Sequence, residues 1–249
     1  MVMPDWRKWL ALWWTRALGS APLVAAVLVV GGALLAAPAP ADAAPGSDAH
    51  PLRWMKVAEG GASVVGGPRH VAITIPARPT GGDVEGAYES ACRLKGDFDV
   101  QVDFALTKWP AKSGVRAGLI FGDTFNALER LSYAPNDGSA TFAPNGPTEL
   151  YLTDLNRVSI PTDQRIGKLR QTRSGNVVTS YCLSGSRWAK ISSGPYTTDA
   201  VWFGVAAWTN TAFFSGQETR VVFSEPQVSG GVLSCPAGGR PKRPPLHSR

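Results

Sequence analysis

Three polar residues at alternate positions, Asp99, Gln101 and Asp103, are the first group in this sequence that could do chemistry. They belong to the run Gly96–Leu106. The apolar residues that alternate with them are Phe98, Val100, Val102 and Phe104. Because successive side chains of a β-strand point to opposite faces, we expect one core face and one wet face. Carboxylates on a wet face can hydrogen-bond to sugar hydroxyls, or act as the acid and base of glycoside hydrolysis.

The spacing of these carboxylates argues against catalysis. Positions i and i+4 of a strand are about 13 Å apart. Retaining hydrolysis needs carboxyl groups about 5–5.5 Å apart, and inverting hydrolysis about 6.5–9.5 Å. The short side chains of Asp99 and Asp103 close this gap poorly. We therefore predict no catalytic residue, and expect either ligand binding or an ordinary solvated surface; whether the protein is an enzyme stays open, leaning to no.

Two tryptophans and two arginines form the second group. In the run Val201–Trp208, Trp202 and Trp208 lie opposite the apolar, core-facing set. Exposed rings are typical of sugar-stacking surfaces, the alternative being that a loop or the N-terminal segment covers them. Arg116 and Arg130 could share this face, where guanidinium groups suit carboxylates and vicinal hydroxyls. Ordinary surface charge is the alternative for both arginines.

The sequence predicts no cofactor. The three histidines have no metal-ligand partner at helical or short-loop spacing, and no phosphate-binding or nucleophile motif occurs. Calcium is the one ion that loop groups such as Asp123, Asn136 and Asp137 could hold, although their spacing does not match an EF-hand.

The stretches that must position these residues have the pattern of an all-β protein. About a dozen short β-branched and aromatic runs between Ala62 and Phe223 are separated by Gly, Pro, Asn or Asp. The segments Leu169–Arg173 and Val177–Leu183 flank Ser-Gly-Asn, which predicts a hairpin. The spacing favours a sandwich or barrel over βαβ units.

The first 43 residues have the order of a secretory signal peptide, which we expect to be helical. Basic residues are followed by an uncharged stretch with the apolar centre Ala21–Ala37, and then by the small-x-small sequence Ala41-Asp42-Ala43. We expect cleavage, a mature chain from residue 44, and a secreted protein with no stable membrane span. The alternative is an uncleaved anchor with the protein facing outside, although 17 helical residues span only about 26 Å of a core about 30 Å thick.

The formal net charge of +6 arises mainly at the two ends of the 249-residue chain. Residues 231–249 form a basic, Pro-rich tail that we expect to be disordered. A nucleic-acid partner would call for clustered positive charge within the folded part, so we expect none.

Several segments together resemble the concanavalin A-like lectin/glucanase superfamily, which includes laminin-G-like domains. They are GDFDVQVDFAL, GVRAGLIFGD, GKLRQTRSGNVVTSYCLSGSRWAKI and VWFGVAAWTN. The resemblance implies a two-sheet antiparallel jelly-roll β-sandwich over residues 60–230, preceded by an N-terminal extension, residues 44–59. It also implies a sheet face that meets glycan. Laminarinase-type glucanases of this fold carry E-x-D-x-E on one strand, and Asp99, Gln101 and Asp103 depart from that motif at all three places.

The three cysteines cannot all pair within the chain. Since the first and last strands of such a fold often lie side by side, we expect a disulfide between Cys92 and Cys235, with Cys182 a buried strand residue. The resulting hypothesis is a secreted, monomeric, non-catalytic carbohydrate-binding module. A glycoside hydrolase or lyase of the same fold, and an adhesion or protein-interaction module, are the alternatives.

Overall fold

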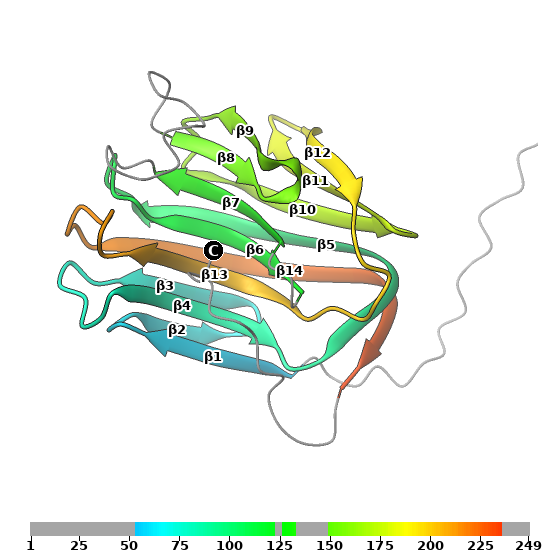
Figure 1. Cartoon of the computed structure of the whole chain (residues 1–249), viewed down its shortest axis with the longest axis horizontal. Coiled ribbons are helices and arrows are strands. Elements are labelled where there is room, and N and C mark those ends of the chain that lie inside the picture. Colours follow the sequence, from blue (N-terminus) through cyan, green and yellow to red (C-terminus); the bar gives the residue numbers. More distant parts are fainter. Residues whose placement is uncertain (1–52, 123–125, 133–148, 236–249) are drawn as a thin grey trace, which may run out of the picture. The chain divides into compact units, whose positions relative to one another are not determined.

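Antiparallel strands make up most of the described chain (Figure 1). The computed structural model describes residues 53–122, 126–132 and 149–235. Sheet A contains, in spatial order, β1 (Trp54–Glu59), β4 (Asp83–Ser90), β13 (Phe203–Asn210), β6 (Arg116–Phe121), β7 (Asn126–Ser132), β8 (Glu149–Thr153) and β9 (Val158–Pro161). Sheet B contains β12 (Arg187–Pro195), β11 (Val177–Ser184), β10 (Ile166–Ser174), β5 (Arg93–Lys108), β14 (Thr219–Ser234), β3 (His70–Ile75) and β2 (Ser63–Gly67). A short 3-10 helix, Leu155–Arg157, joins β8 to β9.

The predicted two-sheet antiparallel sandwich is confirmed. Two strands of sheet A go beyond the predicted set, namely β1 and β9. The first lies in the stretch expected to be an extension, and pairs with β4 through all six of its residues. Both are edge strands with few buried side chains, so neither shows the hydrophobic alternation by which a strand is recognised.

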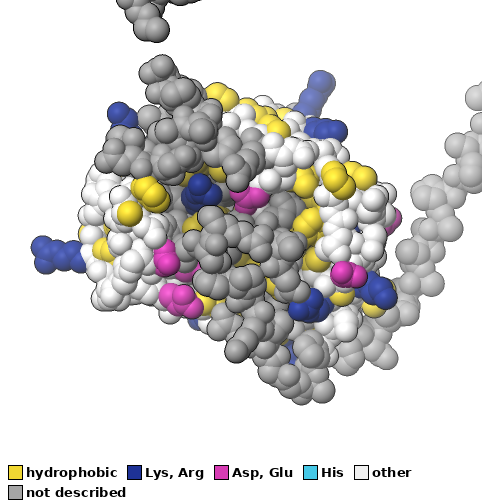
Figure 2. All heavy atoms as spheres, in the orientation of Figure 1, with side chains coloured by type: hydrophobic (Ala, Val, Ile, Leu, Met, Phe, Trp, Pro, Cys, Tyr) yellow, Lys and Arg dark blue, Asp and Glu magenta, His cyan; other side chains and the backbone are white. Residues whose placement is uncertain are grey.

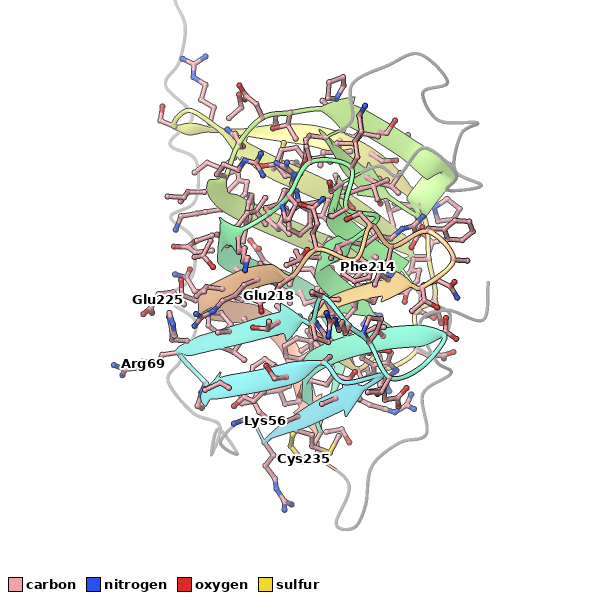
Figure 3. The ribbon with its side chains drawn as sticks, turned by 90° about the vertical axis from the view of Figure 1, so that its left-hand side faces the viewer. Lys56, Arg69, Phe214, Glu218, Glu225 and Cys235 are labelled. Atoms are coloured by element: carbon pink, nitrogen blue, oxygen red, sulfur yellow. A yellow bond between two sulfur atoms is a disulfide. The ribbon has the colours of Figure 1, made fainter. Side chains whose placement is uncertain are left out.

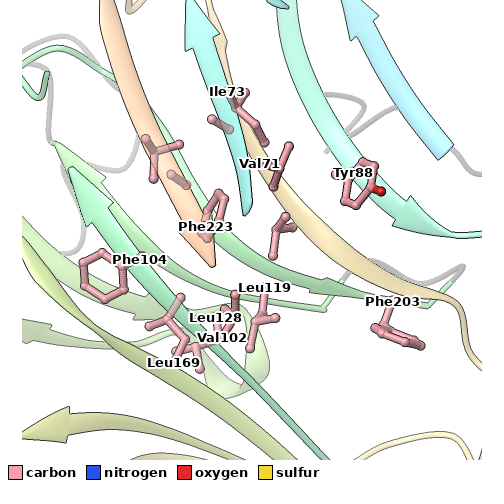
Figure 4. Close-up of a cluster of buried hydrophobic side chains, with 14 of the residues drawn as sticks. Val71, Ile73, Tyr88, Val102, Phe104, Leu119, Leu128, Leu169, Phe203 and Phe223 are labelled. Atoms are coloured by element: carbon pink, nitrogen blue, oxygen red, sulfur yellow. The ribbon is translucent and has the colours of Figure 1, made fainter. Parts of the chain in front are cut away.

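The core lies between the sheets, and the alternation in β5 determines which residues enter it (Figure 4). Phe98 and Phe104 of β5 are 4 % and 2 % exposed. Phe98 stacks on Phe121 of sheet A with centroids 5.6 Å apart, and Phe104 meets Tyr151 edge-on at 6.3 Å. Burying one large apolar side chain stabilises a fold by about 1.5–3 kcal/mol, so these cross-sheet contacts hold the layers together.

The predicted hairpin is formed by β10 and β11. Ser174 pairs with Val177, which leaves a two-residue turn of Gly175 and Asn176. Gly175 has φ of 57°, a left-handed conformation that glycine adopts without steric strain.

A disulfide joins Cys92, just before β5, to Cys235, just after β14 (Figure 3). Their Cα atoms lie 4.1 Å apart although 143 positions separate them in the sequence. This is the pair expected from the sequence, and Cys182 is buried with a free thiol. Across the part of the chain that is described, no helix is long and apolar enough to span a bilayer.

Candidate functional site

The outer face of sheet B carries the polar residues of β5. Asp99 accepts hydrogen bonds from Arg170 of β10, with Nε 3.0 Å from both carboxylate oxygens and Nη2 2.6 Å from Oδ2. Asp103 pairs with Lys168 at 2.7 Å. Gln101 donates from Nε2 to Asp99 at 3.2 Å. The two carboxylates are therefore neutralised by neighbours in their own sheet.

Arg170 is also enclosed by aromatic rings of the next strands. Its guanidinium carbon lies 5.4 Å from the ring centre of Tyr181 and 5.5 Å from that of Trp188. Cation–π contacts of this kind hold the arginine in place. On this part of the outer face of sheet B, the side chains of Asp99, Arg170, Tyr181 and Trp188 thus contact one another.

The outer face of sheet A carries a different set of groups. In the strand register, Trp208 of β13 lies between Arg116 of β6 and Glu85 of β4. Residues directly opposite one another on neighbouring strands have Cβ atoms about 4.5–5.5 Å apart. A tryptophan ring is thus flanked by a guanidinium group on one strand and a carboxylate on the other.

Small residues form the floor of this face beside that row. In the row two residues away from Trp208 along each strand, Ala87, Ala206 and Gly118 lie side by side. The next row places Glu89 beside Gly204. Figure 2 views the molecule from the side of sheet A, where acidic, basic and hydrophobic side chains of the described residues are seen together.

The tryptophans of this face are buried. Trp202 and Trp208 are each 3 % exposed, and they belong to a hydrophobic cluster separate from the core between the sheets. Glu85 and Glu89 are 1 % and 4 % exposed. The two rings are therefore enclosed and do not form an open stacking platform.

The predicted site residues do not form one site. Asp99, Gln101 and Asp103 lie on the outer face of sheet B, whereas Arg116 and Trp208 lie on sheet A and Trp202 directly precedes β13. Their strands have the same two-sided pattern, but a two-layer sandwich has two outer faces, and the pattern does not say which one a strand contributes to.

Arg130 lies on neither outer face. The register pairs Arg116 with Leu131 and Arg130 with core-facing Ala117, so the two arginines point to opposite sides of sheet A. Arg130 is 1 % exposed. We conclude that its place is structural, in contrast to the role expected from the sequence.

Arg130 is the centre of a buried polar network between the sheets. It donates to the carbonyl oxygens of Gln164 (2.6 Å) and Leu150 (3.3 Å), and to the carboxylate of Glu149 (3.2 Å). Glu149 also accepts a hydrogen bond from the Trp109 indole at 2.6 Å. The buried charge is thus paired and hydrogen-bonded, as its desolvation requires.

Burial also changes the proton affinity of two members of this network. It lowers the pKa of the Arg130 guanidinium, while Tyr151 and Glu149 oppose that shift. Burial raises the pKa of Tyr151 to about 12, against the effect of Arg130. The guanidinium carbon lies 5.0 Å from the centre of the Tyr151 ring.

Glu85 and Glu89 are the residues that sequence reasoning missed. Both lie on β4, Asp83–Ser90, whose strand pattern is weak in the sequence. A signal was present, because Val84 and Tyr88 face the core while Glu85, Ala87 and Glu89 alternate with them. Three glycines between residues 81 and 86 conceal it, since glycine is unfavourable in strands.

No group of three or more acidic, histidine or cysteine residues that could hold a metal ion occurs among the residues described. The loop groups considered for calcium, Asp123, Asn136 and Asp137, lie outside those residues.

Comparison with known proteins gives likeness in structure only. The sequence matches no protein-family profile and no curated protein. A functionally unknown protein from Saccharomyces cerevisiae matches over 74 % of this chain and 97 % of its own, with 13 % identity and a TM-score of 0.50. The catalytic domain of a GH131 beta-glucanase from Podospora anserina matches over 67 % of this chain and 74 % of its own, with 14 % identity and a TM-score of 0.50.

The chain has the concanavalin A-like jelly-roll fold. Lectin I-B4 from Griffonia simplicifolia also matches this fold, over 74 % of this chain and 94 % of its own, at 11 % identity and a TM-score of 0.49. At these identities, a concanavalin A-like fold fixes the architecture and leaves the activity to be argued from the residues of the site.

Proposed function

We propose that this protein binds carbohydrate on the outer face of sheet A. The observation that carries the proposal is the row in which Trp208 lies between Arg116 and Glu85. An aromatic ring presents an apolar face to the C–H groups of a sugar. The guanidinium group and the carboxylate beside it supply donors and acceptors for its hydroxyl groups.

The floor of small residues gives the sugar room. Ala87, Ala206 and Gly118 project little from the sheet, while tryptophans lie beyond them at both ends. Because Trp202 and Trp208 are 3 % exposed, a sugar would reach them only in a more open arrangement of this face. The carbohydrate-active neighbour of this fold, the GH131 beta-glucanase, makes glucans the first sugars to test.

We also infer that the protein acts outside the cytoplasm. The N-terminal 43 residues have the order of an export signal. The Cys92–Cys235 disulfide fits this inference, because disulfides persist in oxidising compartments. Mass spectrometry of the exported product should find an N-terminus near residue 44, and an intact residue 1 would contradict cleavage.

The binding proposal is tested by titrating the exported protein with laminarin, barley β-glucan and yeast mannan in a calorimeter. We expect Trp208→Ala to weaken binding about ten-fold or more, because the stacking surface is lost. Trp188→Ala, on the outer face of sheet B, is the matched control and should bind as the wild type does. Circular dichroism verifies that each variant is folded. Equal loss in both variants, or no binding to any of the three polysaccharides, would contradict the proposal.

A further inference from the structure

The outer face of sheet A carries a buried apolar cluster that is separate from the core between the sheets. Besides Trp202 and Trp208, the cluster contains Val57, Ala87, Ile120, Ala127 and Ala206. All of its members are between 0 % and 5 % exposed. The described residues form two layers of strands, and no third layer among them covers this face. Side chains on the outer face of a sandwich are ordinarily in contact with solvent, so this burial calls for a covering segment.

The Cys92–Cys235 disulfide fixes the place where the C-terminal tail, residues 236–249, begins. Cys92 follows the end of β4 by two positions. Leu94, two positions further on, pairs with Val201, which precedes Trp202. The chain after Cys235 therefore leaves the fold at the end of this face where Trp202 lies.

The tail is long enough to run the whole length of the face. Fourteen residues follow Cys235 in the sequence. In an extended, Pro-rich conformation they reach about 43 Å, at about 3.1 Å per residue. The eight residues of β4 span about 27 Å. A tail that starts near Trp202 can therefore pass over the row that contains Trp208.

The composition of the tail suits this face. The tail lies outside the described residues, and its sequence contains four prolines and four basic residues but no acidic one. Pro-rich segments in the polyproline II conformation dock on surfaces lined by aromatic rings. The floor of Ala87, Ala206 and Gly118 projects little between the two tryptophans, which leaves room for a backbone.

The charge of the face complements that of the tail. Asp83, Glu85 and Glu89 lie on the outer side of β4, and Glu59 of β1 is opposite Glu85. On the outer side of β1, β4, β13 and β6, these four carboxylates stand against one guanidinium group, that of Arg116. The summed charge of such a strip attracts a basic segment at a distance, whatever hydrogen bonds each carboxylate makes within the fold.

We propose that the C-terminal tail docks on the outer face of sheet A and covers the carbohydrate site, a proposal that rests on sugar binding at this face. Tail and sugar then compete for the ring of Trp208, and the 3 % exposure of this ring describes the covered state. Polysaccharide binds only after the tail has left. The measured affinity is therefore lowered by the fraction of molecules whose face is open.

The experiment compares the exported protein with a variant that ends at Cys235 and so keeps the disulfide. A second variant keeps the full length and reverses the charge of the tail through Arg240→Glu, Lys242→Glu and Arg243→Glu. The matched control makes the same charge reversal at three exposed positions of sheet B, namely Arg187→Glu, Lys190→Glu and Arg220→Glu. Circular dichroism verifies that each protein is folded.

Two measurements are made on each protein. Acrylamide quenching of tryptophan fluorescence reports ring exposure, and a Trp208→Phe change in each background isolates the contribution of Trp208. We expect stronger quenching of Trp208 in both tail variants and none of this increase in the sheet B control. Calorimetry with laminarin, barley β-glucan and yeast mannan should show about ten-fold tighter binding by both tail variants.

Unchanged quenching of Trp208 in both tail variants would overturn the proposal, because another segment would then cover the face. Stronger quenching without a gain in affinity for a polysaccharide that the protein binds would overturn the competition. Failure of the proposed function gives a different result. If Trp208 becomes exposed in the variant that ends at Cys235 and no polysaccharide binds, carbohydrate binding is overturned while docking of the tail stands.

Discussion

Arg170 donates hydrogen bonds to Asp99 from the neighbouring strand, with its Nε atom 3.0 Å from each carboxylate oxygen. The carboxylate oxygens of Asp99 therefore accept hydrogen bonds from within the protein. The acidic face of β5 has the pattern of a ligand-binding surface in the sequence. In the folded protein, this ion pair instead links β5 to β10.

Asp99→Ala should therefore affect stability and leave ligand binding unchanged. We expect the free energy of unfolding to fall by about 1 kcal/mol, the range for partly exposed, charge-assisted pairs. Urea titration measures the loss, with Asp163→Ala, an exposed loop position, as the control. Weaker polysaccharide binding by a folded Asp99→Ala protein would instead place the site on sheet B.

The raised pKa of Tyr151 predicts that the folded protein loses stability at alkaline pH. Its pKa is raised to about 12 in the folded state, whereas an unperturbed tyrosine has a pKa near 10. Above pH 10 the unfolded chain releases this proton while the folded chain keeps it, so folding becomes less favourable. The decrease should approach about 1.4 kcal/mol per pH unit until pH 12. Urea unfolding between pH 8 and pH 11 should show a smaller decrease for Tyr151→Phe, and parallel curves for the two proteins would contradict this explanation.

The Cys92–Cys235 disulfide should contribute strongly to stability. Its cysteines are 143 positions apart, and closing a loop of that length stabilises a fold by about 5 kcal/mol in the chain-entropy model. Denaturation of the double variant Cys92→Ser, Cys235→Ser measures the loss. A non-reducing peptide map of the wild type and of Cys182→Ala should show the same linked peptide, and a peptide linked through Cys182 would refute the pairing.

Gly204→Ala tests the close approach of β13 to β4. The added methyl group would come within 2.7 Å of the Tyr88 carbonyl oxygen and 2.9 Å of Glu89 Cα, so the strands must shift. We expect destabilisation of about 1–3 kcal/mol. Gly67→Ala is the control, because a Cβ atom there has no neighbour within 4 Å. Equal melting temperatures for the two variants would show that β4 yields without strain.

Local sequence patterns predicted where the strands lie better than they predicted which strands are neighbours in a sheet. The alternation in β5 was visible because four large apolar residues repeat at every second position. Trp208 and Asp99 each alternate with core-facing residues, yet their strands belong to different sheets. Strand order depends on contacts distant in sequence, which no local pattern contains.

The acidic residues of β4, Glu85 and Glu89, escaped prediction for a different reason. Its inward positions include Gly86, where a larger residue would collide with Ile73, since an added Cβ atom would lie 2.4 Å from Ile73 Cγ2. The tight packing of the two sheets therefore removes the apolar side chain that would have marked the strand. A site on such a strand becomes recognisable once the register is known.

The cross-link at the end of β14 also sets the path of mechanical force. A pull applied to the chain after Cys235 is divided between the backbone of β14 and the sulfur atoms that lead to Cys92, at the corner between β4 and β5. Strand β14, which lies between β5 and β3, is thereby shielded from being peeled out of its sheet. A protein tethered through its C-terminal segment would thus bear load as a locked unit and would not unzip from its last strand.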